Sequence, residues 1–182
     1  MKTKRIIITG GPGSGKTSLI HFFKEKGYFC LPEISREVTL KAQEEGIEQL
    51  FLKDPILFSD LLLKGRLQQF QEATLANEKM LFYDRGMPDV TAYMDYLGTK
   101  YPNYFSETCR ENRYDAIFLL PPWEAIYRQD NERYESFEQA EIIFQYLHKS
   151  YEDYGYTVHH VPVGSIEYRG AFILKKIESL RL

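Results

Sequence analysis

The feature that most constrains this chain is a glycine-rich segment between two apolar stretches. Gly10–Thr17 reads Gly-Gly-Pro-Gly-Ser-Gly-Lys-Thr and fits the pattern G-x-x-x-x-G-K-[ST]. The β-branched run Arg5–Thr9 precedes it and is typical of a buried strand, and Gly15–Lys26 follows it with the apolar spacing of a helix. A strand, a loop of this kind and a helix in direct succession favour a phosphate-binding loop over a plain glycine turn.

Each residue type in this loop suits phosphate binding. Glycines let the backbone curl so that successive N–H groups point at phosphate oxygens, and the start of the helix adds its positive end. Lys16 can reach the β- and γ-phosphates of a nucleoside triphosphate, and the Thr17 hydroxyl can bind Mg²⁺. The expected nucleotide-binding residues are Gly11, Pro12, Gly13, Ser14, Gly15, Lys16, Thr17 and Ser18.

Strand and helix patterns alternate along the rest of the chain. Further strands are expected at 28–31, 80–84, 116–120 and 157–163, and further helices at 34–45, 54–78, 89–96, 105–111, 123–128 and 165–180. Asp54 and Pro55 suit the N-cap and the first turn of the helix at 54–78. Another helix is expected to start at Ser136 with a capping box, because Gln139 lies three residues on. Short apolar strands separated by helices predict an α/β fold, a parallel five-stranded sheet covered on both faces. We expect one domain over residues 1–182, with ligands bound at the carboxyl ends of the strands.

An acidic residue and an arginine close the strand expected at 80–84. Asp84 ends the strand, where a carboxylate can bind Mg²⁺ directly or through water, and Arg85 can meet a substrate phosphate. The alternative is a strand-end aspartate in an ordinary ion pair. Beside a phosphate-binding loop, the functional interpretation is favoured.

A second carboxylate, Glu33, follows the strand expected at 28–31. It can accept a proton from an attacking hydroxyl or bind Mg²⁺. It can equally be a first-turn glutamate that the helix dipole favours, with Arg36 as its partner one turn on. The sequence leaves both interpretations open.

A polar segment after the fourth expected strand is a candidate lid, at about 128–136. Arg128 and Arg133 can stabilise the charge of a phosphoryl group in transfer. The alternative is a solvated charged loop. Arg169, in the last expected helix, is interpreted as a surface arginine, with an approach to a bound base as the alternative.

Composition excludes several classes of partner. The net charge of −3 gives no general attraction to nucleic acid or anionic membrane. No apolar run approaches the roughly 20 residues of a membrane helix. Cys30 and Cys109 lie far apart and in no metal-binding spacing, which indicates reduced thiols in a cytoplasmic protein.

With these motifs in place, the chain resembles a family of compact AAA-type P-loop ATPase domains. That domain is shared by the ribosylnicotinamide kinase part of NadR and the TRP-channel translocation-defect protein. The segments that carry the resemblance are GGPGSGKTSLI at 10–20, LPEISREV at 31–38, FYDRGMPD at 82–89 and LLPPWEAIYRQDNERYESFEQA at 119–140. The resemblance implies a three-layer sandwich with sheet order 2-3-1-4-5 and binding of ATP or GTP.

More distantly, the layout is similar to that of nucleoside and nucleotide kinases. Those enzymes place an acidic residue after the second strand, an acidic-Arg pair after the third and arginines in a lid, which Glu33, Asp84-Arg85, Arg128 and Arg133 match. The chain lacks the Asp-Glu pair of motor ATPases at Asp84-Arg85 and has no N-K-x-D guanine motif.

The expected activity is therefore ATP-dependent phosphoryl transfer to a small-molecule acceptor, with Mg²⁺. Lys16, Glu33, Asp84, Arg85, Arg128 and Arg133 are the expected catalytic residues, and Thr17 and Asp84 the expected Mg²⁺ ligands. The alternative is a nucleotide-operated module that switches binding to a protein or lipid partner. The acceptor, the choice between ATP and GTP, and whether Glu33 or Asp84 is the base stay open.

Overall fold

The computed structural model describes residues 3–73, 78–127 and 135–182. Arg128, Arg133 and most of the expected lid fall at 128–134, outside the described residues. Within the described residues, no helix is long and apolar enough to cross a membrane.

A parallel sheet forms the centre of the fold. Its strands are β1 (Lys4–Gly10), β2 (Phe29–Leu31), β3 (Met80–Asp84), β4 (Ala116–Leu120) and β5 (Val158–His160). The order is β2-β3-β1-β4-β5 and every pairing is parallel. This confirms the predicted α/β fold and the strand order that the resemblance implied. The central strand β1 is buried in its middle, since Ile6, Ile7 and Ile8 have no exposed surface.

Helices connect the strands and cover both faces. They are α1 (Lys16–Glu25), α2 (Ile34–Glu44), α3 (Leu50–Lys53), α4 (Pro55–Glu72), α5 (Met87–Tyr96), α6 (Asn103–Glu111), the 3₁₀ turn η1 (Glu124–Ile126), α7 (Phe137–Asp153) and α8 (Ile166–Ser179). The capping box predicted for α7 is present, because Ser136 accepts from the backbone of Gln139 and the Gln139 side chain accepts from the backbone of Ser136.

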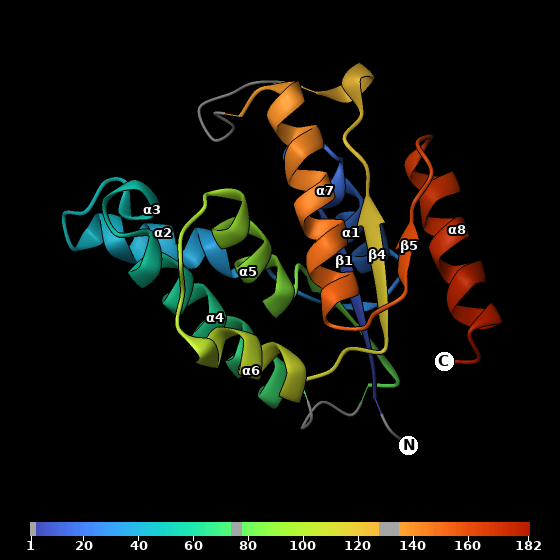
Figure 1. The fold of residues 1–182 in the computed structure, drawn as a ribbon. Coiled ribbons are helices and arrows are strands. Elements are labelled where there is room, and N and C mark those ends of the chain that lie inside the picture. The colour runs from blue at the N-terminus through green and yellow to red at the C-terminus, as the bar shows by residue number, and fades with distance from the viewer. Residues whose placement is uncertain (1–2, 74–77, 128–134) are drawn as a thin grey trace.

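Alternating strand residues divide the core into two sides. Ile6 and Ile8 pack with α1 and α8, whereas Ile7 packs with residues of α4, α5, α6 and α7. The result is a three-layer arrangement, with α8 beyond β5 on one side and α4–α6 on the other (Figure 1). Both faces of the sheet are thereby removed from water, as a parallel sheet requires.

Several elements differ from the sequence prediction. Helices α5 and α6 each begin two residues earlier than predicted, and α3 was not predicted. The helix expected at 54–78 starts as predicted, with Asp54 capping Leu57 and Pro55 in the first turn, but ends at Glu72. Residues 74–77 of the expected range lie outside the described residues. The helix expected at 123–128 is only the short turn η1, and the strand expected at 157–163 pairs only over Val158–His160. The ends of helices and strands are the part of a pattern-based prediction that is least well defined.

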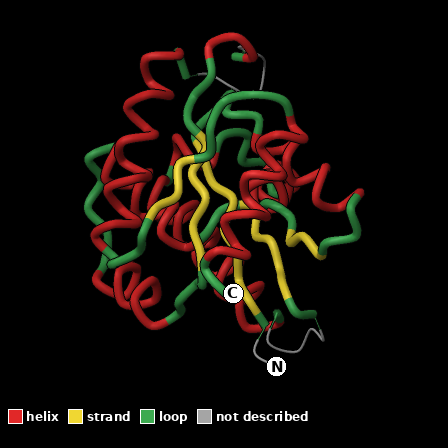
Figure 2. Tube along the Cα trace, turned by 90° about the vertical axis from the view of Figure 1, so that its right-hand side faces the viewer, coloured by secondary structure: helices red, strands yellow, loops and turns green. Residues whose placement is uncertain are grey.

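The strands run in one direction, so the loops that follow them gather at one end of the sheet. In Figure 1 the segment that follows β4 lies at the upper end of the fold, and Figure 2 shows the strands side by side among the helices. The candidate site therefore lies at this upper end.

Candidate active site

The predicted phosphate-binding loop has the backbone that such a loop needs. Gly13 and Gly15 have φ angles of +69° and +77°, in the left-handed region that glycine adopts without strain. Helix α1 begins at Lys16, and no side chain caps it. Its first backbone N–H groups are therefore available to an anion bound in the loop.

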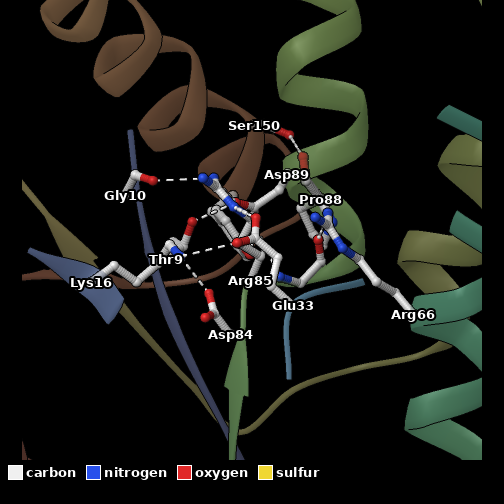
Figure 3. A network of polar contacts seen from close by, with 12 residues as sticks. Thr9, Gly10, Lys16, Glu33, Arg66, Asp84, Arg85, Pro88, Asp89 and Ser150 are labelled. Carbon is white, nitrogen blue, oxygen red and sulfur yellow. Dashed lines mark hydrogen bonds and ion pairs between the residues drawn. The ribbon is translucent and has the colours of Figure 1, made fainter. Parts of the chain in front are cut away.

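Lys16 and Asp84 meet across the central strands. The parallel register of β1 and β3 aligns Asp84 with Ile8, just before the loop. The Lys16 Nζ atom lies 2.5 Å from Asp84 Oδ1, and the two side chains are only 6% and 9% exposed. Figure 3 shows this pair as part of a larger polar network.

Glu33 extends the network from the end of β2. Its Oε1 atom accepts from Arg85 Nε at 2.7 Å, and its Oε2 atom lies 3.8 Å from Lys16 Nζ. Burial by itself would raise the pKa of Glu33, but the charges of Arg85 and Lys16 and a hydrogen bond from Ser35 outweigh it and hold this pKa well below its ordinary value. The carboxylate is therefore ionised and makes no capping hydrogen bond to α2.

Arg85 joins three segments of the site. Its φ of 72° is unusual for a residue with a side chain and turns the guanidinium back across the end of the sheet. Besides Glu33, it donates to the Gly10 carbonyl at 3.1 Å and lies 3.5 Å from Asp89 Oδ1. Arg85 thus ties the phosphate loop to the loops after β2 and β3 (Figure 3).

Asp89 is a site residue that the sequence analysis missed. It is 1% exposed, and its carboxylate accepts from Thr9 Oγ1 at 2.5 Å, Tyr151 OH at 2.5 Å and Gly86 N at 3.0 Å. These bonds hold the tight turn that orients Arg85. The signal in the sequence is an aspartate in the first turn of a helix that opens with Met87-Pro88, a position that suits capping.

The segment after β4 lies against the phosphate loop. A Cβ atom built on Gly13 would fall 2.3 Å from the Tyr127 ring, and one built on Gly15 would fall 3.1 Å from Ile126 Cδ1. Tyr127 also packs edge-on against Phe137 at the start of α7. The two glycines are therefore required by close packing as well as by backbone angle.

The interpretation of Arg169 as a surface arginine was wrong. Its side chain is 2% exposed and reaches from α8 to the phosphate loop, where Nη2 donates to the Ser14 carbonyl at 2.8 Å. The residues are 155 positions apart in the sequence. No local pattern could have connected them.

The described structure thus brings four of the predicted catalytic residues together, namely Lys16, Glu33, Asp84 and Arg85. Thr17, a predicted Mg²⁺ ligand, lies exposed in the first turn of α1. Among the described residues, no group of three His, Cys, Asp or Glu side chains could hold a metal ion by itself.

Two comparisons of the sequence identify relatives. Residues 5–169 match the model of a family described as AAA domain. A UPF0200 protein from Thermococcus kodakarensis is 30% identical over an alignment of 149 residues, and the match covers 75% of this chain and 76% of that protein.

Solved structures of kinases and of NadR share the fold. A deoxyadenosine kinase from M. mycoides, with dCMP and dCDP bound, has a TM-score of 0.69 and 17% identity, over 96% of this chain and 99% of that one. The NadR protein in complex with NAD and AMP-PNP has a TM-score of 0.72 and 16% identity, over 99% of this chain and 50% of that one. The family match and the NadR structure confirm the resemblance inferred from the sequence.

Proposed function

The chain belongs to this AAA-domain family, and we propose that it is an ATP-dependent phosphotransferase of nucleoside- or nucleotide-kinase type with a small-molecule acceptor. The observation that carries the proposal is the meeting of Lys16 with two carboxylates, Asp84 at 2.5 Å and Glu33 at 3.8 Å, at the phosphate loop. Phosphoryl transfer to an acceptor uses one carboxylate to bind the metal ion of the triphosphate and a second to accept the proton of the acceptor hydroxyl. A nucleotide switch has no acceptor hydroxyl and therefore requires no such proton acceptor.

The nucleotide would bind along Gly11–Ser18. Backbone N–H groups of the loop and of the first turn of α1 would contact phosphate oxygens, and Lys16 would exchange Asp84 for the β- and γ-phosphates. ATP is the proposed nucleotide, and GTP stays open. The solved relatives hold nucleotides, dCMP and dCDP in the kinase and AMP-PNP in NadR, which supports a nucleotide ligand here.

Thr17 and Asp84 fit a magnesium ion that arrives with the triphosphate. They offer a hydroxyl and a carboxylate oxygen, the donors that Mg²⁺ prefers, and Mg²⁺ in such sites takes one or two protein ligands and completes its shell with phosphate and water. The ion would neutralise charge on the β- and γ-phosphates.

Glu33 is the proposed proton acceptor, because Asp84 faces the nucleotide side through Lys16. The acceptor hydroxyl oxygen forms a bond to the γ-phosphorus, the bond from that phosphorus to the bridging oxygen breaks, ADP leaves, and the hydroxyl proton passes to Glu33. Arg85 would contact the transferred phosphoryl group or an acceptor phosphate. Arg128 and Arg133 keep their proposed role in covering that group during transfer.

A product screen tests the proposal. The protein is incubated with Mg-ATP and a panel of nucleosides, nucleotides and sugars, and phosphorylated products are detected by mass, with Lys16→Ala as the inactive control. One acceptor should gain a phosphate and raise ADP release by orders of magnitude over slow hydrolysis, because water is excluded until the acceptor is bound. If no acceptor is phosphorylated and a protein or lipid binds in only one nucleotide state, the proposal is overturned in favour of the switch.

A further inference from the structure

A buried arginine without a counter-charge lies behind the phosphate loop. Arg169 is 2% exposed, its Nε atom has no hydrogen-bond partner, and no carboxylate among the described residues pairs with it. Burial lowers its pKa from the ordinary value, although a guanidinium stays protonated at neutral pH. An unpaired buried charge is costly, so it needs an explanation.

The guanidinium contacts the loop that we propose binds the triphosphate. Its Nη2 atom donates to the Ser14 carbonyl at 2.8 Å. Its Nη1 atom lies 2.7 Å from the position that a Cβ on Gly15 would take. Arg169 therefore covers the Ser14–Gly15 peptide group and leaves no room for a side chain at Gly15.

This contact fixes the direction of one backbone donor. A trans peptide group is planar, so its N–H points opposite to its C=O, and no peptide of the described chain is cis. Because the Ser14 carbonyl is held toward Arg169, the Gly15 N–H is directed to the opposite side of the loop. A charge-assisted bond to the carbonyl also polarises the peptide and strengthens its N–H as a donor.

We infer that Arg169 is a positioning residue for the triphosphate, an inference that rests on the proposed nucleotide site. It acts through the Ser14–Gly15 peptide, whose N–H it aims at the phosphates, and the bound phosphates supply the negative charge that the folded protein lacks at this position. The contribution of Arg169 to binding affinity therefore grows with the number of phosphates in the ligand. Arg169 does not touch the reacting atoms.

Calorimetry with Mg-ATP, AMP and inorganic tripolyphosphate tests the inference on the full chain. Arg169→Gln keeps a donor but removes the charge. The loss of a charged hydrogen bond corresponds to about a 10- to 100-fold higher Kd for Mg-ATP and tripolyphosphate, with a clearly smaller change for AMP. Arg169→Lys keeps the charge without the planar fork and should recover part of the affinity.

Arg5→Met is the matched control. Arg5 is also a buried arginine with an unpartnered Nε atom, 6% exposed and stacked over Phe70, but it lies at the other end of β1 from the phosphate loop. Its replacement should lower the melting temperature and leave the ratio of ATP to AMP affinity unchanged. If the effect of Arg169→Gln came only from a general loss of stability, Arg169→Gln and Arg5→Met would change the ratio of ATP to AMP affinity alike.

The outcomes separate the two claims. If wild type binds ATP and Arg169→Gln binds it within twofold of wild type, the inference is overturned and the proposed function stands. If Arg169→Gln does not fold, an unchanged ratio of ATP to AMP affinity in Arg169→Lys overturns the inference. Wild type that binds neither ATP, GTP nor tripolyphosphate overturns both.

Discussion

Replacing Glu33 by glutamine is the most informative single change in the candidate site. Glutamine keeps the size of the side chain and can still accept a hydrogen bond from Arg85, but it has no charge and cannot take a proton. If Glu33 is the proton acceptor, the rate of phosphoryl transfer should fall by about 10²- to 10⁴-fold. Binding of ATP should change far less, because Glu33 is on the proposed acceptor side.

The geometry sets the size and sign of the effect on ATP binding. Glu33 Oε2 lies 3.8 Å from Lys16 Nζ, and the Glu33 side chain is 19% exposed. Two unit charges about 4 Å apart attract by ~1 kcal/mol in water and by ~4 kcal/mol at the effective dielectric constant of a protein surface. Glu33 therefore draws Lys16 away from phosphate, and its neutralisation should leave ATP affinity unchanged or raise it up to about 10-fold. Asp84, at 2.5 Å, still holds Lys16 and limits the gain.

The same substitution should lower the stability of the free protein. It weakens the charged hydrogen bond with Arg85 at 2.7 Å, and the loss should be about 1–3 kcal/mol of unfolding free energy at neutral pH. Denaturant unfolding measures it.

Single-turnover rates with the acceptor found in the product screen, beside ATP dissociation constants, complete the test. Glu37→Gln is the control, one turn into the helix that Glu33 precedes. Glu37 is exposed and, among the described residues, pairs with Lys41 along the helix surface, so its loss should change neither rate nor ATP affinity. If Glu33→Gln transfers phosphate at the wild-type rate and only loses stability, Glu33 has a structural role. If Glu33→Gln loses ATP affinity while the transfer rate is unchanged, Glu33 does not lie on the acceptor side of the site.

Three further predictions follow from the same contacts. Lys16→Ala should weaken Mg-ATP binding by about 2–4 kcal/mol, and calorimetry that gives wild-type affinity would remove the basis of the nucleotide site. Gly13→Ala combines an unfavourable left-handed backbone with a clash against Tyr127, so it should lower the melting temperature. The loss should exceed that of Gly27→Ala, because Gly27 has a φ of +83° but its Cβ would meet nothing within 4 Å. Equal losses would contradict the close packing of Tyr127 against Gly13. The pKa of Glu33 is held below its ordinary value of 4.5, so the stability that its charge contributes is present above pH 4.5 and is lost as the pH falls further. The difference in unfolding free energy between wild type and Glu33→Gln should therefore narrow below pH 4.5. A constant difference down to pH 2 would show that this pKa is not lowered.

The sequence predicted those parts of the molecule that depend on neighbours along the chain. The run Arg5–Thr9 and the loop Gly10–Thr17 gave the first strand, the turn and the helix in the right order, because β-branched residues, glycines and helix periodicity act locally. Ser136 with Gln139 located the start of α7 for the same reason. Placing Glu33 and Asp84 at one edge of the sheet needed only the rule that parallel strands end on the same side.

Only the tertiary structure decided which charges meet and which side chains are buried. The sequence offered Arg36 as a partner for Glu33, but the carboxylate lies against Arg85, 52 positions away, and Lys16. It gave no sign that Asp89 orients Arg85, or that Arg169 is buried behind the phosphate loop. These outcomes depend on the register between strands and on the packing of α8 against α1, which bring distant residues within a few ångströms. Which charged side chains pair, and which side chains are buried, depends on these distances in space. The order of residues along the chain does not give those distances.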